Sequence, residues 1–449
     1  MDTAGIAIVG GGCSGALVAA QLLRQGFSGR ITLIEMRARL GRGLAYSTSF
    51  DQHLLNVPAG KMSAFAGEPA HFLEWLQARN WPGAAADAFA PRRLYGEYIE
   101  DVLHTSVSSA GSRSFRHLRA EVRDINAVPG GLALVLSNGS TVATRKAVLA
   151  LGNPASAPFE IRSLGDRWHA SPWIGDALQV RVAGERILLV GTGLTAVDSA
   201  LALHVHALPC TTYMLSRRGI LPHVHDLRRI PAPPPVFEEP GNIRLMFRQL
   251  RAQIRRLREE DGCWRMAVDA LRPVSNELWQ GLPVGDRSRF LRHLKTYWEA
   301  HRHRMAPQVR RRMDELRQQG KVEVMAGRIR RNDCQGDAIR LTVALRRGGE
   351  RWLAVDRAIN CTGIHEDYRQ CPRPLIRTVI AKGLASPNDL GIGFRTNEFG
   401  ALIDASGQAS TTLFTLGPPR RGELFETTAV PEIRCQAESL ARRLMDALP

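Results

Sequence analysis

Two glycine-rich turns constrain this chain more than any other feature of its sequence. The first follows an apolar segment, residues 5–9, and precedes a run of good helix formers, residues 16–23; it reads Gly10-Gly11-Gly12-Cys13-Ser14-Gly15. In a strand–turn–helix unit this G-x-G-x-x-G spacing allows a tight turn at Gly10, a close approach of the backbone to a pyrophosphate at Gly12, and close packing of helix on strand at Gly15. The helix then points its free N-terminal amides, including those of Cys13 and Ser14, at the phosphates. The pattern predicts a Rossmann-like dinucleotide-binding domain.

A carboxylate at the end of the next apolar segment supports this interpretation. Residues 30–34 read as a second strand, and Glu35 follows them directly. At this place a carboxylate accepts hydrogen bonds from ribose hydroxyls and disfavours a 2'-phosphate. We therefore expect FAD at the first turn; the alternative is that Glu35 is an ordinary charged residue at a strand end.

The same arrangement recurs later in the chain. Residues 186–190 form an apolar segment that leads into Gly191-Thr192-Gly193-Leu194-Thr195-Ala196 and an apolar helix. The next expected strand, 211–215, ends in Ser216-Arg217-Arg218, which can donate to a 2'-phosphate. The second turn thus predicts a nicotinamide dinucleotide, with NADPH favoured over NADH, unless Arg217 and Arg218 are simply surface arginines.

Length and composition allow an enzyme of more than one domain. The chain has 449 residues, of which 44% are hydrophobic and 23% charged, so two or three hydrophobic cores are expected. The start of the sequence lacks the pattern of a signal peptide, and no apolar run reaches the roughly 20 residues that a spanning helix needs, so we expect a cytoplasmic protein without a membrane span. Seven cysteines occur without a Cys-x-x-Cys pair, which argues against dithiol chemistry. No metal site is predicted.

The formal net charge of +17 suits binding of anions, small or polymeric. The excess lies between residues 242 and 331, where apolar residues recur at helical spacing, and we interpret this stretch as a mostly helical insertion. Its arginines could line a pocket, contact nucleic acid or form a solvated helix face; they include Arg302, Arg304, Arg310, Arg311 and Arg312.

Two buried-strand patterns bracket the second turn. One ends at Gly152 to Pro154 and the other at residues 360–363, and in two-dinucleotide flavoproteins such ends resemble the two crossings between domains. The fold class predicted is α/β, with two Rossmann-like, three-layer domains, the NADP domain being nested in a split FAD domain. The expected FAD domain comprises residues 1–170 and 363–449, the NADP domain 171–241 and 321–362, and the helical basic insertion 242–320.

The segment before the second turn contains a further pattern. Gly165, His169 and Trp173 have the G-x-x-x-H-x-x-x-W spacing, which resembles the linker signature of Baeyer-Villiger monooxygenases. Ser163 stands where that family has phenylalanine, and Ile174 follows Trp173. A plain interdomain linker is the alternative.

Longer motifs carry a family resemblance over nearly the whole chain. They are Gly43-Leu44-Ala45-Tyr46, residues 53–63 (HLLNVPAGKMS), residues 191–198 (GTGLTAVD), Ser216-Arg217-Arg218-Gly219 and residues 416–422 (LGPPRRG). Together they resemble the bacterial FAD/NAD(P)-binding family that contains HpyO-type FAD-dependent urate hydroxylases and CreE-type amino-acid N-monooxygenases. The resemblance implies that NADPH reduces FAD, that oxygen adds at flavin C4a to give a hydroperoxide, and that an electron-rich substrate takes one oxygen atom. It also implies that the turn at Gly417 faces the flavin.

No catalytic side chain is assigned, because the flavin itself would transfer the oxygen. Asn56, in an otherwise apolar run, is expected to supply hydrogen bonds near the flavin ring, or else to be a turn residue. His53 and Lys61 could orient an anionic substrate, and His223 and His225 follow the arginine pair, but a structural or solvated role is favoured for all four.

The leading hypothesis is an FAD-dependent, NADPH-consuming monooxygenase whose partners are molecular oxygen and a small polar or anionic substrate, such as a urate-like purine, an amino acid or an amine. The alternatives are an NADPH oxidase or reductase without oxygen transfer, a nucleic-acid-interacting flavoprotein, and a flavin-bound scaffold. Nucleic acid is not favoured as a partner, and a homo-oligomer stays open.

Overall fold

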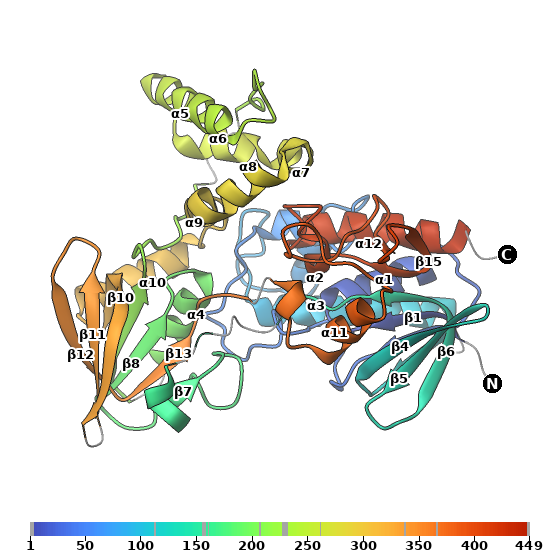
Figure 1. Ribbon diagram of the computed structural model, residues 1–449, viewed down its shortest axis with the longest axis horizontal. Helices are drawn as coiled ribbons and strands as arrows, with labels where there is room; N and C mark the ends of the chain where they lie inside the picture. Colours follow the sequence, from blue (N-terminus) through green and yellow to red (C-terminus); the bar gives the residue numbers. More distant parts are fainter. Residues whose placement is uncertain are drawn as a thin grey trace.

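The computed structural model describes residues 4–111, 114–154, 159, 161–205, 208–226, 232–260, 262–335, 338–364 and 367–446. Two sheets with parallel centres lie at opposite ends of the molecule, and a group of helices stands over the region between them (Figure 1). Both chain ends lie beside the first sheet, so the second sheet is inserted within the first in sequence.

The first sheet combines the beginning and the end of the chain. Its strand order is β14-β15-β6-β1-β2-β3, and β15, β6, β1, β2 and β3 are parallel, whereas the β4–β5 hairpin is joined to β6. The bounds are β1 Ala4–Val9, β2 Ile31–Ile34, β3 Phe115–Leu118, β4 Val122–Val128, β5 Gly131–Leu136, β6 Thr141–Leu149, β14 Ala401–Ile403 and β15 Ala409–Thr415. Next to β1, all of β2 and the last four residues of β6 are buried, as expected for strands that helices cover on both faces.

Helices cover both faces of this sheet. On one face, α1 (Cys13–Arg24), α3 (Arg92–Ala110) and α12 (Val430–Asp446) share a core with β1, with α2 (His71–Ala78) at its margin. On the other, α11 (Pro374–Ala381) packs over β4 and β5. The N-terminal and C-terminal segments therefore build one domain together.

The second sheet has the order β12-β11-β10-β9-β8-β13-β7, in which β7 to β10 and β13 are parallel and β11 and β12 are antiparallel. The bounds are β7 Trp168–His169, β8 Glu185–Val190, β9 Cys210–Ser216, β10 Val322–Gln335, β11 Ala338–Leu345, β12 Glu350–Val355 and β13 Arg357–Asn360. Helices α4 (Leu194–Leu203) and α10 (Pro307–Gln318) cover one face. On the other face, Ile161 and Leu164 pack against the sheet.

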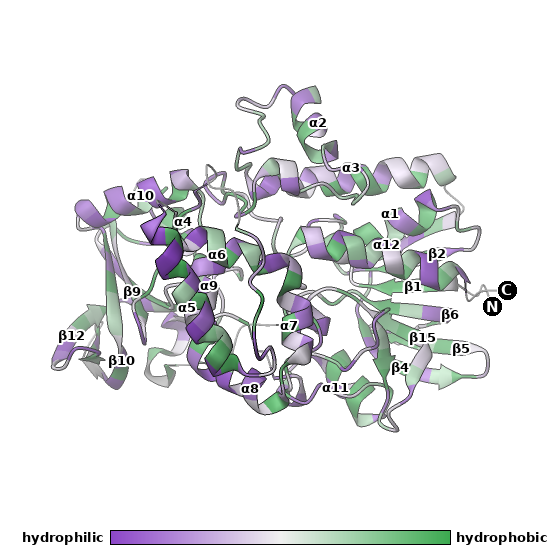
Figure 2. Cartoon of the chain, turned by 90° about the horizontal axis from the view of Figure 1, so that it is seen from above, coloured by the Kyte–Doolittle hydropathy of each residue, from purple (hydrophilic) through white to green (hydrophobic). Residues whose placement is uncertain are grey.

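The remaining helices form the group above the two sheets. They are α5 Ile243–Glu259, α6 Trp264–Ala270, α7 Ser275–Gly281, α8 Val284–Arg289 and α9 Lys295–Arg302. Asn242 caps α5 by accepting hydrogen bonds from the amides of Arg244 and Leu245. In Figure 2 hydrophilic and hydrophobic residues alternate along α5, as expected for a helix with one buried side.

This helical group packs on the C-terminal part of the first domain. The ring of Trp279 stacks on that of Phe425 at 4.7 Å between centroids, and its Nε1 donates to the carbonyl of Gly422. Arg302 forms an ion pair of 3.1 Å with Glu426, and both side chains are nearly buried. The helices are thus fixed to the first domain rather than projecting freely.

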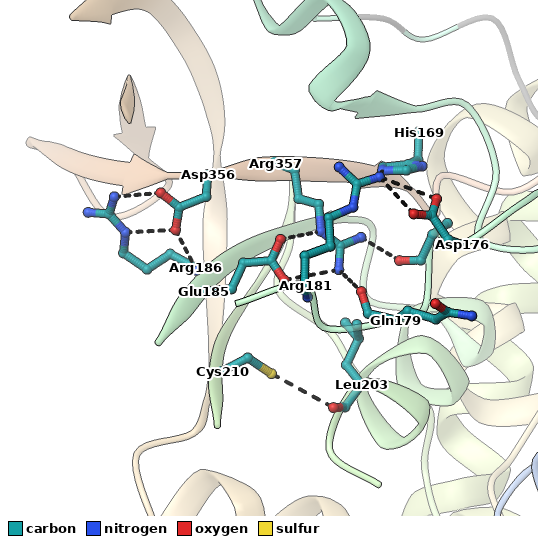
Figure 3. A network of polar contacts seen from close by, with 11 residues as sticks. His169, Asp176, Gln179, Arg181, Glu185, Arg186, Leu203, Cys210, Asp356 and Arg357 are labelled. Carbon is teal, nitrogen blue, oxygen red and sulfur yellow. Dashed lines mark hydrogen bonds and ion pairs between the residues drawn. The ribbon is translucent and has the colours of Figure 1, made fainter. Parts of the chain in front are cut away.

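A buried ion pair joins two neighbouring strands of the second sheet, β8 and β13, where the chain enters that sheet. Arg357 at the start of β13 is 1% exposed and donates to the carboxylate of Glu185 on β8 at 2.6 Å (Figure 3). The same guanidinium also donates to the carbonyls of Ala177 and Gln179 in the loop before β8. Removal of either charge would leave the other buried without compensation, which is costly.

The predicted fold class is confirmed: two Rossmann-like units, one nested in the other, with helices inserted. Two boundaries differ in detail from the expected ones. Trp168–His169 already pairs with β13 in the second sheet, before the expected start at 171. Helix α10, which we expected within the insertion, packs on the second sheet through Val309, Met313 and Leu316. Among the described helices, none combines the length and the apolar character needed to cross a membrane.

Candidate functional site

The first glycine turn joins β1 to α1, and two of its glycines are required by the protein itself. Gly10 has a φ of +102°, and a Cβ there would lie 2.4 Å from the carbonyl oxygen of Ala150. A Cβ on Gly15 would lie 1.9 Å from the carbonyl oxygen of Gly10. Helix α1 can therefore start this close to the strand ends only because both positions lack a side chain.

The carboxylate of Glu35 lies beside this turn. Its Oε2 accepts a hydrogen bond from the amide of Gly11 at 3.0 Å, and its Oε1 accepts one from the amide of Arg37 at 3.0 Å. The predicted acidic residue at the end of β2 is thus held against the glycine turn, at the position where a ribose would be recognised.

The N-terminus of α1 is enclosed by two other glycines. A Cβ on Gly12 would lie 3.3 Å from the Cα of Gly43, and a Cβ on Gly417 would lie 3.3 Å from Oγ of Ser14. Gly417 has a φ of +70°, which favours glycine, and its amide donates to Gln436. The structure thus brings the predicted C-terminal turn against the first helix, whereas its contact with flavin stays a prediction.

Cys13 opens α1 but is not a reactive thiol. Burial raises its pKa to about 12, and the pKa of Cys361 beside the second turn is raised to about 12 for the same reason. Since the thiolate is the nucleophile, such thiols are inert at neutral pH. The cysteines whose side chains the structure describes, Cys13, Cys210, Cys263, Cys361, Cys371 and Cys435, are free.

The second glycine turn joins β8 to α4 and repeats this geometry with one difference. Gly191 has a φ of +134°, and a Cβ there would lie 2.3 Å from the carbonyl oxygen of Cys361. Gly193 has a φ of −77°, and a Cβ there would meet no heavy atom within 4 Å. No described residue comes close enough to require glycine at 193, so there is room for a bound group beside the first residues of α4, Leu194 and Thr195.

The predicted 2'-phosphate residues follow β9. The hydroxyl of Ser216 accepts from the amide of Gly219 and lies 2.9 Å from the hydroxyl of Thr192, so it holds the turn in place. Arg217 and Arg218 line a cavity of about 360 Å³. The structure adds three arginines to this cavity that the sequence analysis missed: Arg328, Arg330 and Arg346.

This arginine cavity has a strongly positive field. Hydrogen bonds from Arg346 and Arg218 lower the pKa of Tyr297 at its margin. Among the described residues, no carboxylate lies within ion-pair distance of Arg217, Arg328, Arg330 or Arg346, in contrast to the neighbouring Arg351, which pairs with Glu323. The sequence did contain one signal for this cavity. Arg328 and Arg330 are two residues apart on a strand, and side chains at positions i and i+2 lie on the same face of a sheet.

The junction between the two domains contains His53, Asn56 and His225 from the sequence analysis, whereas Lys61 is exposed at the end of the 3-10 turn Ala59–Lys61. The Nε2 of His53 donates to the carbonyl of Asp198 in α4, and its Nδ1 accepts from Thr48. Arg92 at the start of α3 lies 2.8 Å from the carboxylate of Asp198. His53 is fully buried and burial lowers its pKa, so it is a neutral structural residue.

Asn56 lies at the same junction. Its backbone carbonyl accepts a hydrogen bond from Nε2 of His225 at 3.0 Å, and the ring of His225 packs on Phe89. Burial lowers the pKa of His225 to about 4, which supports the structural role favoured for it. Of the linker residues, Trp173 lies at this junction, since its ring contacts that of His53 edge-on at 5.7 Å, whereas His169 lies in β7 beside Arg181.

The insertion arginines divide into two groups. Arg302 and Arg304 are buried and paired with Glu426 and Asp269. The other three lie on α10: half-exposed Arg310 and exposed Arg312 form pairs within the helix, and Arg311 is exposed. The first two are therefore not available to phosphates of a nucleic acid.

Both turns fit a dinucleotide. Each presents the N-terminus of a helix behind a glycine turn, and the empty space at Gly193 and the unpaired arginines are what a pyrophosphate and a phosphate would fill. Residues 7–154 match a family model described as FAD-NAD(P)-binding. This match confirms the FAD/NAD(P)-binding character predicted for the first domain.

The whole chain resembles solved flavoenzymes in fold. The cadaverine monooxygenase of Erwinia amylovora, solved with FAD, has 12% identity and a TM-score of 0.69 over 100% of this chain and 96% of its own. The L-lysine 6-monooxygenase of Pseudomonas syringae has 14% identity and a TM-score of 0.67, with 99% and 100% covered. The ornithine N-hydroxylase of Kutzneria sp. 744, solved with reduced FAD, NADP+ and L-ornithine, has 14% identity and a TM-score of 0.65, with 99% of each chain covered. No curated protein sequence matches the chain significantly. The chain thus has the two-dinucleotide fold of flavin-dependent monooxygenases.

Proposed function

We propose that the protein is an NADPH-dependent flavin monooxygenase that hydroxylates a small polar or anionic substrate. The observation that carries this proposal is the agreement in fold, from end to end, with monooxygenases that act on ornithine, lysine and cadaverine. This agreement in fold extends over the helices between the two sheets as well as the two dinucleotide turns. Those three substrates are amines, which supports an amine or amino acid here; a urate-like purine is the other candidate.

Each turn has its own task in this proposal. Gly10, Gly12 and Gly15 shape the site for the FAD pyrophosphate, and Glu35 accepts from the ribose. Gly191 and Gly193 shape the site for NADPH, with Ser216, Arg217 and Arg218 beside its 2'-phosphate. When bound, FAD takes electrons from NADPH and passes them to oxygen. The protein positions the two cofactors and keeps water out.

Substrate-dependent coupling tests the activity. FAD-loaded protein is mixed with NADPH in air and with a panel of amines, amino acids and purines, while NADPH consumption and peroxide release are both measured. The right substrate accelerates NADPH oxidation and lowers the peroxide formed per NADPH. Peroxide that stays stoichiometric with every candidate would instead indicate an NADPH oxidase or reductase.

The arginine cavity supports NADPH over NADH, and its residues give a separate test. Loss of one charge-assisted pair to a phosphate costs about 1.5–3 kcal/mol, or about 10- to 100-fold in binding. We expect Arg217→Gln and Arg218→Gln to lower kcat/KM for NADPH by about that factor, with little change for NADH. Arg347→Gln, an exposed arginine outside the cavity lining, is the control. Equal losses with both dinucleotides would contradict the assignment.

Two alternatives lack structural support. Dithiol reduction needs a reactive thiol pair, and the thiols next to the two turns, half-buried Cys13 and buried Cys361, both have raised pKa values. Nucleic-acid binding would require an RNA affinity that falls steeply with salt. The buried pairing of Arg302 and Arg304 removes two of the arginines on which that reading rested.

A further inference from the structure

A second large cavity lies within the helical group, and neither dinucleotide turn contributes to it. Its volume is about 510 Å³, within the range of small-molecule sites. It opens between α5, the start of α6 and the end of α9; its lining comprises His223, Arg251, Ile254, Arg255, Arg258, Trp264 and His301.

Three rings in mutual contact form one wall of this cavity. The ring of Trp264 lies 4.8 Å from that of His223 and 4.5 Å from that of His301, and the two histidines are 4.4 Å apart. Burial, with the nearby charges of His301 and several arginines, lowers the pKa of His223 to about 4. At neutral pH this histidine is therefore uncharged, and it shares with Trp264 a wall of rings along the cavity. The guanidiniums of Arg265 and Arg304 also lie over the Trp264 ring, 4.5 Å and 5.1 Å from its centroid.

Three arginines of α5 form the opposite side. Arg251, Arg255 and Arg258 are spaced four and three residues apart, so they share one face of the helix. Among the described residues, no carboxylate forms an ion pair with any of the three. Arg304, behind Trp264, is by contrast buried and paired with Asp269. The cavity thus combines unpaired guanidinium donors on one side with flat rings on the other.

We propose that this cavity binds a small planar anion, an aromatic carboxylate, whose ring stacks on Trp264 while its carboxylate pairs with the α5 arginines. Both halves of the ligand are needed. A guanidinium recognises a carboxylate through paired hydrogen bonds, and an aromatic wall selects a flat ring over a saturated one. The proposal does not rest on the oxygenase activity, because the binding involves no turnover.

Calorimetric titration of the full-length, FAD-loaded protein tests it, with four probes that separate ring from charge. Benzoate carries both features, cyclohexanecarboxylate only the charge, benzamide only the planar ring, and inorganic phosphate a charge without carbon. We expect benzoate to bind at least about fivefold more tightly than each of the others, as loss of a stacking or charge-assisted contact implies. Equal affinity for benzoate and cyclohexanecarboxylate, or for benzoate and benzamide, would overturn the proposal.

Variants locate the binding. Arg255→Gln and Trp264→Leu are each expected to weaken benzoate binding by about fivefold or more. Arg256→Gln, an exposed arginine of the same helix outside the cavity lining, is the matched control and should leave it unchanged. Arg255 is exposed, so its replacement keeps the fold even if the Trp264 variant does not. Benzoate binding that is insensitive to Arg255→Gln, or that saturating NADP+ abolishes, would show that the ligand sits elsewhere.

Discussion

Glycines of the two turns serve different purposes, according to their place in the motif: Gly15 holds the last position of the first turn, and Gly193 the middle glycine position of the second. At Gly15 a methyl group would meet the backbone of Gly10 at 1.9 Å. At Gly193 it would meet nothing within 4 Å, and the backbone conformation is one that any residue adopts. Gly15 is therefore required for the packing of helix on strand, whereas no described residue requires glycine at 193, which fits the proposed pyrophosphate site.

This contrast gives a paired prediction. Gly193→Ala should fold with an unchanged midpoint of unfolding and a full complement of FAD, but with a raised KM for NADPH, because the methyl occupies the space left for the pyrophosphate. Gly15→Ala should lose about 2–3 kcal/mol of the free energy of unfolding, or fail to fold, because backbone must move. For both variants, thermal unfolding gives the midpoint, the flavin-to-protein absorbance ratio gives the FAD content, and steady-state kinetics give KM for NADPH. A normal KM for NADPH in Gly193→Ala would remove the second turn from the cofactor site.

Among the elements, α4 is tied to the first domain by a single buried charge pair. Asp198 is 5% exposed in its side chain, and Arg92 at the start of α3 lies against it at 2.8 Å. Arg92→Met leaves that carboxylate buried without compensation, which typically costs about 3–5 kcal/mol. We expect urea denaturation to show a loss of that order.

The neighbouring arginine provides the control. Arg93 pairs with Asp51 at the surface, where the side chains are 37% and 64% exposed. Exposed pairs contribute about 0–1 kcal/mol, so Arg93→Met should change the free energy of unfolding little. If the two variants lost similar amounts of the free energy of unfolding, burial of the Arg92–Asp198 pair would not be what makes it important.

At the scale of the whole molecule, buried neutral histidines make stability depend on pH. The pKa values of His204 and His225 are lowered from 6.5 to about 4, largely by burial. Between about pH 6.5 and pH 4 the unfolded chain binds these protons and the folded chain does not, so the free energy of unfolding falls as the pH falls through that window. His225→Gln, which keeps a donor for the carbonyl of Asn56, should flatten this dependence. Denaturation curves at a series of pH values measure it, and an unchanged slope in the variant would contradict the assignment.

The sequence predicts those parts of the site that are built from a short, continuous segment of the chain. A glycine turn between strand and helix, with a carboxylate or an arginine pair after the next strand, is specified within about 30 residues, and both units form as expected. Arg328, Arg330 and Arg346 escaped notice because β10 and β11 reach Arg217 only through the strand order of the sheet. The ring cluster at Trp264 was missed for the same reason: its members lie on three separate segments of the chain.

The central position of β6 in the first sheet has a consequence for synthesis on the ribosome. β6 pairs with β1 on one side and with β15, near the other end of the chain, on its other side. The inserted sheet, whose last strand in sequence is β13, has all its strands before the final segment emerges. The domain that starts first is thus completed last, and in the nascent chain the edge of β6 at residues 147–149 has no partner strand until residues 409–415 are made.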